Sequence, residues 1–315
     1  MVMQSRVCWI WACGFAACSA CKSAPVASLP TPSDRQLSTA RPAPSQHAMP
    51  EASREPHSAF SRNDAAPVDA APFLPDGCPN AEPGFAAWRP VDPVSLSSDE
   101  GLSLNRSACE WTVTLEGGLV TASQFAKVQP KTPPSFRLPL QWGAPHRIER
   151  RPAGILVGFD RGEWGGALLW YSSAGALQGT LLHENVVEIL PGVASSVAFV
   201  GLAHLGEDSG RAVEILEDAT RFRVGGSVDL KSAPRAVVRE QAGTILVVTH
   251  RGLVRLAPDF TAKTLLDTHW GLLYPNAAAV DAAGIVYVGM RGVVARLAPQ
   301  AGGYREEWLF PPTGK

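Results

Sequence analysis

The chain of 315 residues has little net charge, no cluster of basic residues and no apolar run long enough to cross a membrane as a helix. Its formal charge is −1, and only 18% of its residues are charged. Without a run of Lys and Arg, no surface is predicted to follow a phosphate backbone, so nucleic acid is not expected as a partner. The length allows one large or two small domains with a sizeable core.

The chain also lacks the motifs of several enzyme classes. His183-Glu184-Asn185 has no second His at helical spacing, so it does not form the zinc site of a metalloprotease. There is no Gly-x-Ser-x-Gly elbow and no glycine pattern that would bind a nucleotide. The carboxylates are scattered, and no glycosidase pair can be assigned. We therefore assign no catalytic residue, no metal and no cofactor.

Four of the six cysteines lie near the N-terminus, where a single Arg precedes an eleven-residue apolar run, 7–17, that contains the first two of them. The run has the length of a secretory signal core. Its end, Phe-Ala-Ala-Cys18 followed by Ser-Ala-Cys21, resembles a bacterial lipoprotein signal, although Phe stands where that family usually has Leu. The resemblance implies a signal peptide over 1–21 that is lipidated at Cys18, with Cys21 as the second choice. An ordinary signal peptide with incidental cysteines is the alternative.

The other two cysteines, Cys78 and Cys109, are far from any motif that binds metal or transfers electrons. Export would place them in an oxidising compartment, where they can pair. Closing this loop would contribute roughly 3–4 kcal/mol by the chain-entropy estimate. Two buried free thiols are the alternative.

Residues 22–77 have the composition of a linker. Ten of these 56 residues are proline, and only Phe60 and Phe73 are aromatic. Such a segment buries too little apolar surface to offset the entropy of ordering, so we predict a disordered tether. Together with a lipidated Cys, it would hold a domain over 78–315 away from the membrane.

A unit of about 41 residues recurs in the C-terminal part of the chain, and its copies share glycine residues at their turns. A period of this length is typical of repeat proteins. Its clearest copies begin at Gly243 and Gly284, and further copies lie at 110–122, 154–162 and, more weakly, 197–201. The count is about five units of four strands each. In the last two units we expect strands at 236–240, 244–249, 253–257 and 262–267, and at 277–281, 285–289, 293–297 and 304–310.

Two stretches of the last unit, Asp281-Ala-Ala-Gly284 and the run from Gly292 to Leu297, resemble the β-propeller repeats of bacterial envelope proteins. The resemblance implies an all-β propeller of about five four-stranded blades. Residues 78–100 would cap the ring, supply a partial sixth blade or close it through Cys78. This identifies an architecture and no activity.

Two units depart from the repeat at the turn between the second and third strands. Where the last two units turn tightly at an Arg-Gly step, the second unit inserts 163–167 and the third carries 203–211. The connection 268–274 is expected on the same face. The candidate ligand-binding residues are Glu163, Trp164, His204, Asp208, Trp270 and Tyr274. Aromatic and polar groups together suit a glycan or a partner protein, while packing at blade junctions is the alternative. The recurring Arg161, Arg251 and Arg291 favour a structural role.

The sequence thus leads to two functional hypotheses. The first is a secreted or lipid-anchored propeller of the cell envelope that binds an envelope protein or a glycan without catalysis. The second is a propeller hydrolase or lyase that acts on an extracellular polymer, with Glu188, Arg239 and Asp281 on predicted inner strands as first candidates. A scaffold without any ligand is the third alternative.

Overall fold

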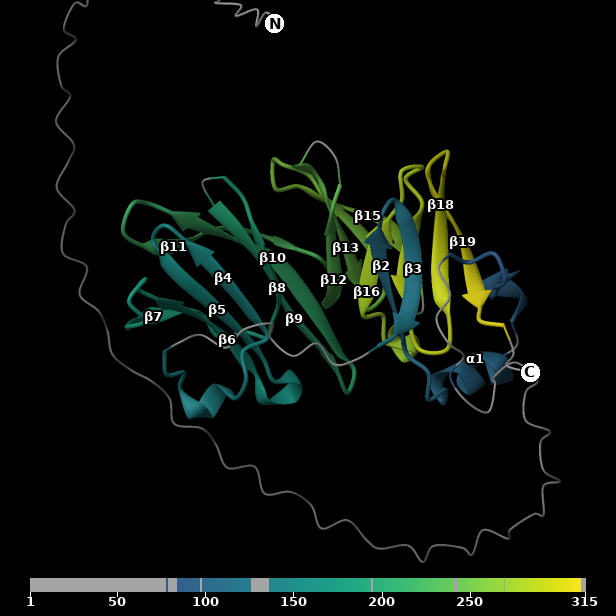
Figure 1. Ribbon diagram of the computed structural model, residues 1–315, viewed down its shortest axis with the longest axis horizontal. Helices are drawn as coiled ribbons and strands as arrows, with labels where there is room; N and C mark the ends of the chain where they lie inside the picture. Colours follow the sequence, from purple (N-terminus) through teal and green to yellow (C-terminus); the bar gives the residue numbers. More distant parts are fainter. Residues whose placement is uncertain are drawn as a thin grey trace, which may run out of the picture. The chain divides into compact units, whose positions relative to one another are not determined.

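The computed structural model describes residues 78, 84–96, 98–125, 136–193, 195–240, 243–268 and 270–312 (Figure 1). The predicted signal peptide, the lipidation site Cys18 and the tether 22–77 lie outside these residues. Among the described residues, no helix has both the length and the apolar character to cross a membrane.

The described chain is all-β, with five antiparallel sheets and one short helix, α1 (Ser98–Asn105). Within each sheet, consecutive strands pair with each other. The sheets are β2 (Trp111–Glu116) and β3 (Leu119–Gln124); β4 (Arg147–Arg151), β5 (Gly154–Asp160), β6 (Gly166–Tyr171) and β7 (Leu177–Leu182); β8 (Val186–Pro191), β9 (Ser195–His204), β10 (Glu207–Glu217) and β11 (Phe222–Asp229); β12 (Pro234–Arg239), β13 (Ile245–Thr249), β14 (Gly252–Leu256) and β15 (Ala262–Asp267); and β16 (Ala277–Val280), β17 (Val286–Gly289), β18 (Val294–Gln300) and β19 (Gly303–Phe310), to which β1 (Arg89–Val91) adds.

The strands predicted for the last two repeats are confirmed. Each of β12–β19 begins within two residues of its expected start. All five residues of β13 are buried because a neighbouring sheet covers each face of the strand. Leu246 and Val248 pack toward β16–β19, whereas Ile245 and Val247 pack toward β8–β11. Side chains that alternate between two covered faces explain why the strand is apolar throughout.

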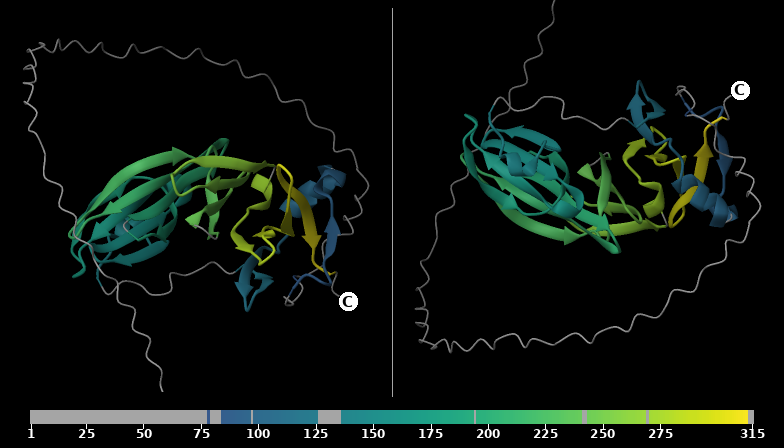
Figure 2. Two further views of the ribbon diagram at one scale, coloured as in Figure 1. Left: turned by 90° about the horizontal axis from the view of Figure 1, so that it is seen from above. Right: turned by 90° about the horizontal axis from the view of Figure 1, so that it is seen from below.

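Successive sheets pack face to face through separate apolar clusters (Figures 1 and 2). The first cluster joins Leu156 and Leu168 of one sheet with Val186 and Val200 of the next. The first strands β4, β8, β12, β16 and β2 lie next to each other in that order. Each pair of sheets therefore has its own core, and the turns of all sheets gather at two opposite ends of the strands.

The repeat copy at 110–122 is placed differently from the prediction. Its alignment with the copy that begins at Gly243 predicts the second and third strands of a unit. The hairpin instead supplies a first and a second strand. The Trp111 N–H donates to Met290 O at 2.9 Å, which places the start of β2 at the turn between β17 and β18. Helix α1 precedes this hairpin. Alternating Val and Thr residues fit either hairpin of a meander, so the alignment could not distinguish them.

Residues before the first hairpin extend the last sheet. Strand β1 pairs antiparallel with β19 as a fifth strand. Cys78 and Cys109 are joined by a disulfide that spans 31 positions of the chain. Next to it, the rings of Trp88 and Trp111 meet edge to face, with centroids 5.0 Å apart. The N-terminal stretch is thus fastened both to β19 and to the start of β2.

Candidate functional site

Three of the six candidate residues come together at one end of two neighbouring sheets. His204 Nε2 lies 2.7 Å from Glu163 Oε2. Glu163 and Trp164 belong to the 3-10 turn η3 (Gly162–Trp164) between β5 and β6, and His204 ends β9. The contact therefore links the turn of one sheet to the hairpin tip of the next.

A buried asparagine holds the η3 turn in place. The Arg161 N–H donates to Asn185 Oδ1 at 3.1 Å, and Asn185 Nδ2 donates to Gly162 O at 2.7 Å. In the sequence, Asn185 stands out only as the residue after His183-Glu184, which lacks the second His of a zinc motif. Its role could not be read from the sequence because its partners lie more than 20 positions away, and no local pattern marks such a bond.

The side chain of Trp164 is exposed, with 71% of the residue's surface accessible. Two aliphatic side chains on adjoining loops are exposed as well: Leu140 at 87% and Leu205 at 93%. The loop of Leu140 is tied to the η3 turn because Arg161 donates to Gln141 O at 2.7 Å. We call these three side chains the Trp164 patch. Neighbouring exposed apolar residues with a polar rim are typical of a binding surface.

The insertion at 203–211 is mostly strand. It lengthens β9 and β10, and the hairpin turns at Leu205 and Gly206. Asp208 therefore lies within β10 and away from the tip. Its carboxylate accepts from Ser232 Oγ at 2.9 Å and from the Ala233 N–H at 2.8 Å. Asp208 supports the connection between β11 and β12, so the candidate that looked like a turn residue has a structural contact.

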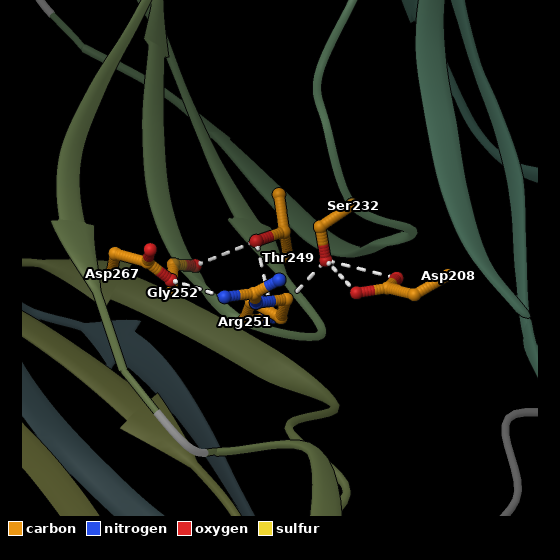
Figure 3. Close-up of polar contacts among 6 residues, drawn as sticks. All are labelled: Asp208, Ser232, Thr249, Arg251, Gly252 and Asp267. Carbon is orange, nitrogen blue, oxygen red and sulfur yellow. Dashed lines mark hydrogen bonds and ion pairs between the residues drawn. The ribbon is translucent and has the colours of Figure 1, made fainter. Parts of the chain in front are cut away.

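The support continues into the turn between β13 and β14 (Figure 3). Ser232 Oγ accepts from the Arg251 N–H at 3.1 Å, and Thr249 Oγ1 lies 3.3 Å from the same N–H. The guanidinium of Arg251 pairs with Asp267 at 3.5 Å. These groups border a cavity of about 110 Å³. Arg251 thus braces the turn, in agreement with the structural role that its recurrence favoured.

The two remaining candidates lie elsewhere. Trp270 is 0% exposed, and its Nε1 donates to Glu306 Oε1 at 2.6 Å. As a core residue it has no surface with which to contact a ligand, so the packing alternative describes it. Tyr274 is about half exposed, and the guanidinium of Arg291 lies over its ring at 4.2 Å. That guanidinium also reaches Glu110, with Nε and Oε1 3.1 Å apart.

The pKa values of three basic side chains are lowered near the starts of β4 and β12. Burial lowers the pKa of Arg235, although Asp160 and Asp208 act in the opposite direction. Burial and the charge of Arg235 lower the pKa of His250, and burial likewise lowers the pKa of His146. Among the described residues, Arg235 Nε and His250 Nδ1 are buried without a hydrogen-bond partner. Burial thus favours the neutral forms of His146 and His250.

The residues named for the hydrolase or lyase hypothesis are held by structural contacts. Glu188 pairs with Arg147 at 2.8 Å, and Asp281 accepts from two backbone N–H groups of its own turn at 2.9 Å. Arg239 donates to Pro191 O at 2.6 Å. Over the ranges that the structure describes, His, Cys, Asp and Glu side chains form no cluster that could hold a metal ion.

No family model matches this chain. No curated protein matches it either. Solved structures show a partial similarity: the extracellular domain named as that of a hybrid two component system, BT4673 from B. thetaiotaomicron, is 13% identical with a TM-score of 0.32. The match covers 63% of this chain and 25% of that one. The corresponding domain of BT3049 is 12% identical, with a TM-score of 0.31 over 64% and 25%. The chain thus matches only about a quarter of those proteins' length, and a similarity at this level does not establish a common function.

Proposed function

We propose that this chain is a binding module of the cell envelope whose ligand docks on the Trp164 patch without being transformed. The observation that carries the proposal is the exposure of Trp164 on a turn that contacts the loop of Leu140 and the hairpin of Leu205. A Trp side chain offers a large contact area and is the residue most often found at the energetic centre of an interface. Two aliphatic neighbours favour a partner protein over a glycan, because a sugar would need more hydrogen-bonding groups around the ring.

The contact between Glu163 and His204 supports this assignment. Both side chains are partly exposed, and an exposed pair contributes little to folding stability. It does fix two loops of different sheets relative to each other, which reduces the entropy lost when a partner binds. The pair also supplies the polar rim that surrounds the apolar centre of a typical interface.

The finer architecture belongs to the same proposal. Four consecutive four-stranded meanders, with first strands in sequential contact, support a β-propeller in which β2 and β3 begin a further blade. The proposal includes a signal peptide at 1–21, a lipid anchor on Cys18 and a tether over 22–77, which would present the module at a membrane surface. Metabolic labelling with palmitate should mark the wild type and fail to mark Cys18→Ser.

The binding proposal is tested with immobilised full-length protein and envelope extracts of the producing cell, followed by titration of each retained protein or glycan. Trp164→Ala should weaken binding about 30-fold, since truncation of a central Trp costs about 2 kcal/mol or more. Leu177→Ala is the matched control, because Leu177 is exposed on β7 of the same sheet. A ligand that binds Trp164→Ala as tightly as wild type, or an extract from which nothing is retained, contradicts the proposal.

A further inference from the structure

A second candidate site lies at the opposite end of the sheets from the Trp164 patch. A cavity of about 710 Å³ opens between the β2–β3 tip, the end of β12 and the β16–β17 turn. Its volume is in the range of pockets that enclose small organic ligands. Trp164 and Leu205 lie at turns between second and third strands, and Leu140 lies in the loop before the first strand β4, whereas this cavity lies at turns between first and second strands. The two sites are therefore separate.

The carboxylates at this cavity are already engaged. Glu240 accepts from Arg255 Nε at 2.9 Å and from Thr244 Oγ1 at 3.1 Å. Asp281 Oδ1 accepts from the N–H groups of Ala283 and Ile285. Arg255 offsets the charge of Glu240, whereas Asp281 keeps its charge and directs one carboxylate oxygen at the N–H groups of its own turn.

Arg239 is the cation at the cavity that has no acidic partner within the described parts of the chain. It is exposed at the end of β12, and its single hydrogen bond there joins one terminal guanidinium nitrogen to Pro191 O. A guanidinium has five N–H donors in a planar fork, which matches the two oxygens of a carboxylate. Arg239 thus keeps donors for an anionic group.

The other side of the cavity is aliphatic. It is formed by Leu115 at the β2–β3 tip and by Val280, Ala282 and Ala283 at the β16–β17 turn. Leu115 is about half exposed, so an aliphatic chain could cover it without displacing another side chain. A ligand that fits must therefore combine an anionic end with an apolar body.

We infer that this cavity binds an aliphatic carboxylate, with Arg239 holding the carboxylate and Leu115 covering the hydrocarbon chain. This cavity shares no residue with the Trp164 patch. Charge complementarity selects the carboxylate, since a neutral alcohol of the same length would gain the apolar contacts alone.

Isothermal titration of the full-length protein with monomeric decanoate and decanol tests this inference. Decanoate should bind more tightly than decanol, and Arg239→Gln should weaken decanoate binding about tenfold or more while leaving decanol unchanged. Leu115→Asn should weaken both. Arg223→Gln, which removes an exposed Arg on β11, and Trp164→Ala should bind decanoate like wild type. Absent decanoate binding, equal affinities for the two probes, or wild-type affinity in Arg239→Gln would overturn the inference.

Discussion

Two turns connect the second and third strands of their sheets: one joins β5 to β6, the other β13 to β14. They differ in length and in their contacts with the neighbouring residues. The first spans an additional 3-10 turn and exposes Trp164. The second closes within two residues, His250 and Arg251, and is braced from both sides. The same repeat thus forms a braced turn in one copy and exposes a side chain in another, depending on the length of a single turn.

Matched glycine substitutions should separate the two turns most strongly. Gly252 begins β14 with φ +151°, and an added Cβ would lie 2.1 Å from Leu266 O. Gly162 has φ +58°, and no atom lies within 4 Å of an added Cβ. Gly252→Ala should lose about 3 kcal/mol or more of unfolding free energy through strain and overlap. Gly162→Ala should lose about 1 kcal/mol. Urea denaturation measures both, and equal losses would show that the tight turn is as adaptable as the longer one.

A second pair of variants removes the side chain that supports each turn. Asn185→Ala should cost about 2 kcal/mol, because the Arg161 N–H and Gly162 O each lose a bond to a buried side chain and keep only their bonds to Gly165 within the turn. Ser232→Ala should cost about 1 kcal/mol, because the Arg251 N–H keeps Thr249 Oγ1 and Asp208 keeps the Ala233 N–H. With fluorine-labelled tryptophan, the signal of Trp164 should shift only in Asn185→Ala. A shift in both variants would mean that the two turns are coupled.

The smallest effect concerns acid. Since the pKa of His250 is lowered by burial in the folded state, the neutral form is favoured there, and stability is fully present above the unfolded pKa near 6.5. It is lost as the pH falls through the folded pKa, because the unfolded chain then binds more protons. His250→Asn should show a shallower loss of stability between pH 7.5 and 5 than wild type, with His146 retaining its own share. An unchanged slope would place the acid sensitivity outside the tight turn.

The position of β13 could be predicted because a strand covered on both faces is almost entirely apolar. Aligning the Arg-Gly steps did not identify which residues correspond in the β13–β14 and β17–β18 turns. Arg251-Gly252 and Arg291-Gly292 align in the sequence, but Gly252 is already the first residue of β14, whereas Gly292 lies within its turn. His250 and Arg291 therefore occupy corresponding positions. The sequence contains this shift: the two copies begin at Gly243 and Gly284, 41 positions apart, whereas their Arg-Gly steps lie 40 apart. Aligning the steps slips the register by one residue, which would exchange the two faces of the strand.

The candidate site could be predicted in part. An insertion into a tight turn has to leave the sheet, and this reasoning led to Glu163, Trp164 and His204, whose role in binding stays a prediction. It failed for Trp270, whose bond to Glu306 joins residues 36 positions apart, and for Asp208, which extends a strand instead of forming a loop. Burial is decided by which distant segment covers a side chain, and no repeat pattern records that.

The disulfide between Cys78 and Cys109 also determines how the folded part would respond to a mechanical load. Strand β1 and helix α1 lie between the two cysteines in the chain. A pull applied ahead of Cys78 would pass through the sulfur bridge directly to the start of β2, so neither element would be under tension. After reduction, the same force would run through both of them before it reached the hairpin of β2 and β3.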